Sequence, residues 1–242
     1  LGDAPFGWNL PNWLLRREIV AHLATLPNVD FRPGVATAQL LTRAGEARVT
    51  LSDGSRIAAK LVIGADGRDS RVREAAGISA RKLRYGQKAL AFAVSHALPH
   101  DNISTEIHRS GGPFTLVPLP DRDGRPCSAV VWMERGPEAM RLAALPEAAF
   151  EAAMTERSAH LFGPLKLASR RTLWPIISQI ADRMVAERVA LVAEAAHVMP
   201  PIGAQGLNTS LHDVAALLDL ARARPDDLGS AEMLASYARQ RE

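Results

Sequence analysis

The sequence predicts an α/β protein in which a mostly antiparallel β domain is inserted between two pieces of one α/β domain. An apolar strand that runs into a glycine-containing turn occurs twice, at residues 60–67 and 189–206. Between them, residues 83–177 show mainly strand patterning. With 242 residues and 47% apolar content, the chain can bury one large core or two smaller ones. We expect residues 1–80 and 180–242 to form one domain and residues 81–179 the other.

Composition restricts the function classes. The net charge is only +3 and the basic residues are spread along the chain, which argues against nucleic-acid binding. Cys127 is the only cysteine, so neither an intrachain disulfide nor a cysteine zinc site is expected, and we assign it to packing. No apolar run has the length of a membrane span and no signal peptide is evident. We therefore expect a cytoplasmic protein, with peripheral contact at the inner face of the membrane left open.

The first element is a predicted helix over residues 12–26. Leu15, Ile19, Leu23 and Leu26 recur at helical spacing, and Pro27 ends the helix. Alternating segments at 34–43 and 46–53 then predict a small antiparallel meander that leads into a buried strand at 60–64. In the inserted block we expect strands at 88–98, 103–109, 113–120 and 126–135, with a helix at 146–162. This pattern predicts an antiparallel sheet with a helix on it.

The first glycine turn lies in "KLVIGADGRDSRVRE", residues 60–74. The strand ends in Gly64-Ala65-Asp66-Gly67. Nucleotide cofactors commonly lie outside the carboxyl ends of parallel strands, where such a turn would sit. Asp-Gly is also a common structural turn, so both interpretations stay open.

The second turn, "MPPIGAQGLNTSLHDV", indicates a binding site more strongly than the first. Pro200 and Pro201 stiffen the approach, while Gly203 and Gly206 let the backbone lie close to a ligand. A helix follows, with Ser210 and Asp213 as a capping pair and an apolar side formed by Leu207, Leu211, Val214 and Leu218. Its amino-terminal N–H groups would favour an anionic partner. The alternative is an ordinary connection between a strand and a helix.

Together, "GADGRDSRVR" and "LVAEAAHVMPPIGAQGLN" resemble the motifs of flavin-dependent aromatic hydroxylases of the para-hydroxybenzoate hydroxylase type. The likeness is greatest to the polyprenylphenol hydroxylases of ubiquinone biosynthesis, and "FGWNLPN", residues 6–12, is similar to that branch. The resemblance implies a partial, Rossmann-like FAD-binding domain with an inserted substrate domain. It further implies FAD as cofactor, NAD(P)H as co-substrate and an aromatic substrate such as a polyprenylated phenol. The alternatives are a hydroxylase of another aromatic compound and a non-catalytic accessory protein of the same fold.

The resemblance also implies roles for individual residues. Arg16 would contact the phosphate and ribitol region of FAD, Asp66 and Gly67 would lie beside the cofactor, and Glu194 would bind the ribitol. The flavin ring would face the loop of Pro201, Gly203, Ala204, Gln205, Gly206, Leu207 and Asn208. Trp132 and Pro118 are expected to line the substrate site, although we give more weight to core packing. No side chain is expected to act as nucleophile or general base.

The histidines are assigned structural roles. The spacing of His96, His100 and His108 fits no standard metal site. His197, in "EAAHVMPP", is expected to be a hydrogen-bonded structural residue near the flavin. We therefore predict no metal site.

Three departures from the family pattern bear on cofactor binding. Ala193-Glu194 replaces the usual Gly-Asp, and Ala204 replaces a glycine. If Ala204 adopts a left-handed conformation, it carries about 1–2 kcal/mol of strain. The G-x-G-x-x-G unit of about 30 residues that opens the family's pattern has no counterpart here. Because the sequence begins with Leu1, we expect a piece of a longer enzyme, and whether it holds FAD by itself stays open.

Overall fold

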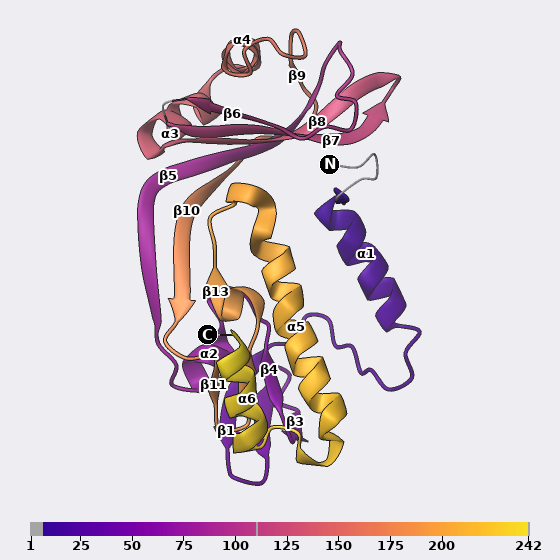
Figure 1. Ribbon diagram of the computed structural model, residues 1–242, viewed down its shortest axis with the longest axis vertical. Helices are drawn as coiled ribbons and strands as arrows, with labels where there is room; N and C mark the ends of the chain where they lie inside the picture. Colours follow the sequence, from indigo (N-terminus) through magenta and orange to yellow (C-terminus); the bar gives the residue numbers. More distant parts are fainter. Residues whose placement is uncertain (1–6, 110, 242) are drawn as a thin grey trace. The chain divides into compact units, whose positions relative to one another are not determined.

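The computed structural model describes residues 7–109 and 111–241, except for the side chain of Ile202 (Figure 1). The chain divides into two compact units. Unit 1 contains the residues up to Phe31 and Tyr85–Ile176, and unit 2 contains Arg32–Arg84 and Ile177–Glu242. The segment up to Phe31, which the sequence analysis assigned to the α/β domain, therefore groups with the inserted sheet. The predicted motif at residues 6–12 begins outside the described residues.

Unit 1 contains an antiparallel sheet with two helices on one face. Its strands follow the order β5 (Ala80–Ser95), β8 (Arg125–Arg135), β7 (Gly112–Arg122) and β6 (Thr105–Arg109), and β9 (Lys166–Leu167) pairs with β5. The helices α3 (Gly136–Ala144) and α4 (Glu147–Arg157) cover one face of these strands (Figure 1). The predicted antiparallel sheet with a helix on it is confirmed. The additional helix α3 was not predicted, although Pro137 at its start is a typical helix-initiating residue.

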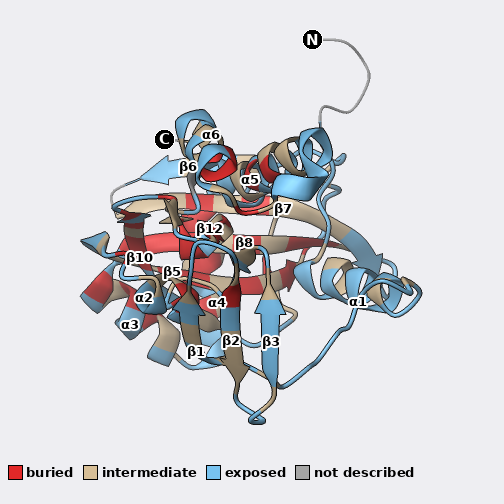
Figure 2. Ribbon diagram, turned by 90° about the horizontal axis from the view of Figure 1, so that it is seen from below, coloured by how far each residue is buried: buried red, intermediate tan, exposed pale blue. Residues whose placement is uncertain are grey.

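The helix-covered face of this sheet carries large buried side chains. Leu90 of β5 lies opposite Trp132 of β8, and both are buried under the helices with Phe150 of α4. The alternate residues point to the other face, where Ala93 lies opposite Ala129. In Figure 2, much of β8 is coloured as buried, whereas β1 and β3 of unit 2 contain many exposed residues.

Helix α1 (Asn12–Leu23) forms where a helix was predicted but buries none of its residues. Ile19, one of the apolar residues at helical spacing, is 51% exposed. The helix predicted for residues 12–26 is therefore present, but its apolar residues are not buried. Helical spacing identifies residues that share a face, but it does not reveal what covers that face.

Unit 2 begins with the predicted meander, which consists of β1 (Thr37–Thr42), β2 (Ala47–Leu51) and β3 (Arg56–Ala59). A second sheet has the order β11 (Val185–Ala186), β12 (Val189–Leu191), β4 (Val62–Gly64), and β12 and β4 are parallel. The strand β10 (Thr172–Ala181) continues from unit 1, and its end pairs with β13 (His197–Val198). The helices of this unit are α2 (Arg71–Ala75), α5 (Gln205–Ala223) and α6 (Ala231–Arg241).

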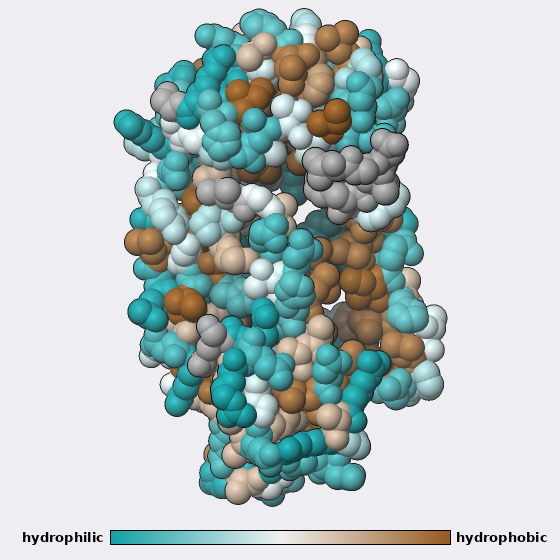
Figure 3. Space-filling model, viewed as in Figure 1, coloured by the Kyte–Doolittle hydropathy of each residue, from teal (hydrophilic) through white to brown (hydrophobic). Residues whose placement is uncertain are grey.

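The side of helix α5 that points inward is not the apolar side identified from the sequence. Asp213 and Leu217 are its buried residues. The predicted apolar side is between 44% and 56% exposed and accounts for apolar surface along α5 in Figure 3: Leu207, Leu211, Val214 and Leu218. Helix α5 carries apolar residues on two sides, and its inward side includes a polar residue.

Candidate functional site

The first glycine turn connects β4 to α2, and Asp66 holds it in place. The Asp66 carboxylate accepts hydrogen bonds from Ser70 Oγ (2.5 Å) and from the Val72 amide (3.1 Å). Ser70 Oγ in turn accepts from the Arg73 amide (2.9 Å), which caps the start of α2. Gly67 has φ 86°, and a side chain at this position would meet no atom within 4 Å. Hydrogen bonds thus hold Asp66 against the start of α2, while the space beside Gly67 is open.

The second turn follows β12 at the same edge of the sheet. Gly64 and Leu191 are register partners at the ends of parallel strands, so the residues after them emerge together. Arg68 Nε and Nη2 donate to the two carboxylate oxygens of Glu194 at 3.1 and 2.9 Å. Arg73 joins the turns as well, because its guanidinium donates to the carbonyls of Ala195 (2.9 Å) and Arg68 (3.0 Å). The structure therefore joins the turn of Asp66 and Gly67 to the turn of Glu194 through Arg68 and Arg73.

Arg68 was missed by the sequence analysis. Its side chain is 33% exposed and that of Glu194 is 48% exposed, so their ion pair is accessible to solvent. The bidentate geometry fixes the direction of the longer Glu194 side chain, which replaces the family's aspartate. An arginine two residues after Asp66 was the available signal, but its partner lies 126 residues away.

The loop before α5 exposes its backbone. Gly203 (φ 69°) and Ala204 (φ 52°, ψ 31°) are left-handed, and residues 203–208 are all exposed. Ala204, the residue at the N-cap position, makes no side-chain capping hydrogen bond to α5. The N–H groups of Gly206 and Leu207, in its first turn, have no acceptor within the helix. With the positive end of the helix dipole, they can bind an electron-rich group.

Two predictions about this loop have clear outcomes. Ala204 adopts the left-handed conformation, so it carries the strain of about 1–2 kcal/mol that was expected in that case. The Ser210–Asp213 capping pair is wrong. Ser210 lies inside α5 and donates to the Gly206 carbonyl at 2.8 Å, whereas Asp213 is directed inward.

Asp213 is fully buried and organises a polar cluster. Its carboxylate accepts from the Ala193 amide (2.9 Å), His197 Nε2 (2.7 Å) and Arg241 Nε (2.8 Å). Burial raises the pKa of Asp213, but the hydrogen bonds from His197, Ala193 and Arg241 outweigh it, so this pKa lies below its ordinary value. His197 is therefore hydrogen-bonded, as expected, and its structural role near the flavin stays a prediction.

The remaining predicted residues lie in unit 1. Arg16 is exposed on α1. Trp132 is 3% exposed, packs against Phe114 and Phe150, and donates to Glu134 at 3.2 Å. By strand alternation Pro118 lies on the same face as Trp132. These positions favour the packing role for Trp132.

His96, His100 and Cys127 make structural contacts. His96 is buried and hydrogen-bonds to the Leu98 carbonyl (2.8 Å) and Ser128 Oγ (3.0 Å), while His100 Nε2 donates to the Leu119 carbonyl (3.2 Å). Within residues 7–109 and 111–241, no group of His, Cys, Asp and Glu side chains could hold a metal ion. Cys127 is buried. Among the same residues, no helix is both long and apolar enough to cross a bilayer.

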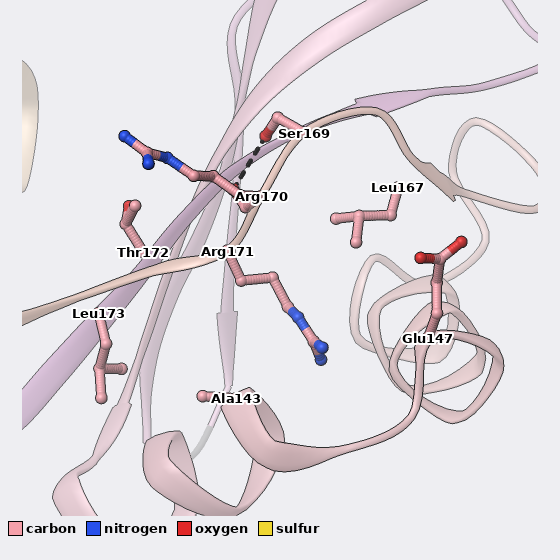
Figure 4. Close-up of a pocket in the computed structure, with 8 residues that line it drawn as sticks. All are labelled: Ala143, Glu147, Leu167, Ser169, Arg170, Arg171, Thr172 and Leu173. Atoms are coloured by element: carbon pink, nitrogen blue, oxygen red, sulfur yellow. Dashed lines mark hydrogen bonds between the residues drawn. The ribbon is translucent and has the colours of Figure 1, made fainter.

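Each unit also has a separate hollow. The hollow in unit 1, about 580 Å³, contains Arg170 and Arg171 (Figure 4). Arg171 donates to the Leu145 carbonyl (2.8 Å), and Arg170 points in the opposite direction, so the two do not converge on one ligand. The hollow in unit 2, about 530 Å³, lies beside α2 and is lined by Ser70, Arg73, Lys82, Gln179 and others.

Known proteins resemble this chain over nearly its whole length. A family model described as "FAD binding domain" matches residues 6–242. Ubiquinone hydroxylase UbiL of Rhodospirillum rubrum is 37% identical over 97% of this chain and 54% of its own length. The mouse mitochondrial ubiquinone biosynthesis monooxygenase COQ6 is 30% identical over 80% of this chain and 48% of its own length.

A solved structure supports the fold. Pseudomonas aeruginosa PqsL, in complex with 2-aminobenzoylacetate, has a TM-score of 0.80 at 24% identity, over 94% of this chain and 64% of that one. The chain spans about half the length of the two ubiquinone-pathway relatives. The match of the family model over residues 6–242, on a fold with two turns at one sheet edge, shows that the chain belongs to the FAD binding domain family.

Proposed function

We propose that this chain is part of a longer flavin-dependent monooxygenase that uses NAD(P)H and O2 to hydroxylate an aromatic ring. The observation that carries the proposal is the exposed start of α5, where Gly206 and Leu207 offer N–H groups after the left-handed Gly203 and Ala204. The family's FAD would supply the oxygen chemistry. Its electron-rich ring edge fits these donors and the positive end of the helix dipole.

The two turns would hold the chain that links the flavin ring to its phosphates. The exposed Glu194 carboxylate and its Arg68 partner offer acceptors and donors for ribityl hydroxyls. Asp66 would act indirectly, because both of its carboxylate oxygens already accept hydrogen bonds from the start of α2. The open space beside Gly67 would let the cofactor approach the backbone. For Arg16, we propose the contact with the phosphate and ribitol region of FAD that the resemblance implies.

For the aromatic substrate, we propose the face of the unit 1 sheet opposite α3 and α4. Ala91 and Ala93 of β5 and Ala129 of β8 share this face and are only partly buried. Their small side chains, with Val131 on the same face, are apolar and would leave room for an aromatic ring. Trp132 and Pro118 share the helix-covered face, so we propose these alanines in their place.

The substrate class is proposed from the relatives. UbiL and COQ6 are named for ubiquinone hydroxylation and ubiquinone biosynthesis. A polyprenylated phenol is therefore the substrate that we propose for the longer protein. Because a polyprenyl tail partitions into lipid, we also propose peripheral contact with a membrane surface.

The test uses the full-length protein that contains this chain. After FAD loading, we expect flavin absorption bands, NAD(P)H oxidation that a polyprenylated phenol accelerates, and one ¹⁸O atom from ¹⁸O₂ in the phenol product. A soluble phenol supplied in parallel distinguishes a hydroxylase of another aromatic compound. NAD(P)H oxidation without ¹⁸O in any phenol would contradict the proposal.

The second candidate is a non-catalytic protein of the same fold. The Arg68–Glu194 ion pair favours it. Arg68 already donates to both carboxylate oxygens of Glu194, the residue proposed to bind the ribityl chain of FAD. A full-length protein that stays colourless after incubation with excess FAD would support this candidate.

A further inference from the structure

Asp213 is a buried carboxylate in the middle of a helix whose other buried residue is apolar. It has no exposed surface, and three donors from outside its own helix converge on it. Burying a charge is costly unless hydrogen bonds and an opposite charge compensate. An apolar residue would pack here without that cost, so the position of the carboxylate needs a further reason.

The turn that Asp213 holds supplies this reason. Ala193 has φ 54°, a left-handed conformation that disfavours a residue with a Cβ atom. Its amide donates to Asp213 Oδ2, and its carbonyl accepts from the Ala196 amide at 2.9 Å. Glu194 is the next residue, so the conformation of Ala193 sets the direction in which the Glu194 side chain leaves the backbone.

The carboxyl-terminal helix α6 completes the arrangement. Arg241 pairs with Asp213 at 2.8 Å and is only 19% exposed. Tyr237, one turn earlier, is buried and donates to the Leu191 carbonyl at 2.8 Å. Helix α6 therefore contacts the end of β12 two residues before the strained turn, and it supplies the positive charge that balances the buried carboxylate.

We infer that Asp213 is a positioning residue that holds the Ala193–Glu194 turn in the conformation that binds cofactor, with Arg241 of α6 as its charge partner. This inference rests on the proposed function, because it takes Glu194 as a ligand of the ribityl chain. It extends the site to the far end of α6, beyond the residues that the sequence motifs contain.

The test compares Asp213→Asn with Asp219→Asn in the full-length protein. Asp219 lies on the same helix, is exposed and has no hydrogen bond or ion pair in the described structure. In Asp213→Asn we expect the FAD dissociation constant, measured by flavin fluorescence, to rise at least about tenfold, because a hydrogen bond between a charged acceptor and a buried donor is lost. Arg241→Met should shift it in the same direction, and Asp219→Asn should leave it unchanged.

A double-mutant cycle separates positioning from general destabilisation. Ala193→Gly removes the strain of the left-handed alanine, so the turn needs less support from Asp213. The loss of FAD affinity caused by Asp213→Asn should therefore be smaller in the presence of Ala193→Gly than in its absence. Equal losses with and without Ala193→Gly would overturn the inference.

Amide hydrogen exchange of the cofactor-free protein distinguishes this inference from the proposed function. We expect Asp213→Asn to accelerate exchange at residues 193–196, relative to Asp219→Asn, while the exchange of β12 stays slow. Unchanged exchange at residues 193–196 would overturn the positioning role. If exchange accelerates but the original protein does not bind FAD, the proposed function fails and the control of the turn by Asp213 stands.

Discussion

Replacing Ala204 by glycine should stabilise the protein, although glycine normally weakens a helix. Ala204 precedes α5 with φ 52° and ψ 31°, and it makes no side-chain capping hydrogen bond to the helix. Relieving a left-handed alanine gains about 1–2 kcal/mol. The greater freedom of glycine in the unfolded chain costs about 0.4–1 kcal/mol. We therefore expect Ala204→Gly to raise the free energy of unfolding by about 0.5–1 kcal/mol, because the relief of strain exceeds the entropic cost.

Thermal unfolding followed by circular dichroism measures this effect. For a chain of this size, the gain corresponds to a rise in Tm of about 1–4 °C. Ala215→Gly is the matched control, because Ala215 is exposed inside α5 and does not have a positive φ. It should lower the free energy of unfolding by about 1 kcal/mol. If Ala204→Gly lowers the Tm as Ala215→Gly does, the strain assigned to Ala204 is refuted.

Two further predictions concern charged and titrating groups. Arg68→Leu removes the exposed ion pair with Glu194, so we expect the free energy of unfolding in urea to fall by less than about 1 kcal/mol and the affinity for FAD to weaken. Arg68→Lys is the control and should give an intermediate affinity. An unchanged affinity for FAD in Arg68→Leu would contradict the proposed ribityl contact. Burial lowers the pKa of His96 below the ordinary 6.5. As the pH falls, His96 therefore binds a proton in the unfolded chain before it does so in the folded chain, which lowers the free energy of unfolding. Between pH 7.5 and 5.5 the midpoint of urea unfolding should therefore fall more for this protein than for His96→Gln, and equal falls would count against the assignment.

The sequence predicted the parts of the fold that local pattern controls. The meander, the antiparallel sheet of unit 1 and the positions of α1, α4 and α5 follow from strand alternation, helical spacing and turn residues. The family's glycine at position 204 marked a place where an alanine would be strained in a left-handed conformation. These features depend on neighbouring residues, so a single sequence contains the necessary information.

The features that were missed depend on contacts between distant residues. Nothing near Asp213 in the sequence indicates that it binds Ala193 and Arg241, which lie 20 and 28 residues away. The pairing of Arg68 with Glu194 spans 126 residues. The inward side of α5 could not be chosen from spacing alone, because the exposed and the buried sides both contain leucines.

A crystal structure of the full-length protein with FAD tests the central claim most directly, since that claim concerns the start of α5. We predict that the pyrimidine edge of the flavin ring lies within about 3 Å of the backbone N–H group of Gly206 or Leu207. We also predict that Gly203 and Ala204 retain their left-handed conformation. A flavin ring bound elsewhere, with the start of α5 packed against other parts of the protein, would contradict the account.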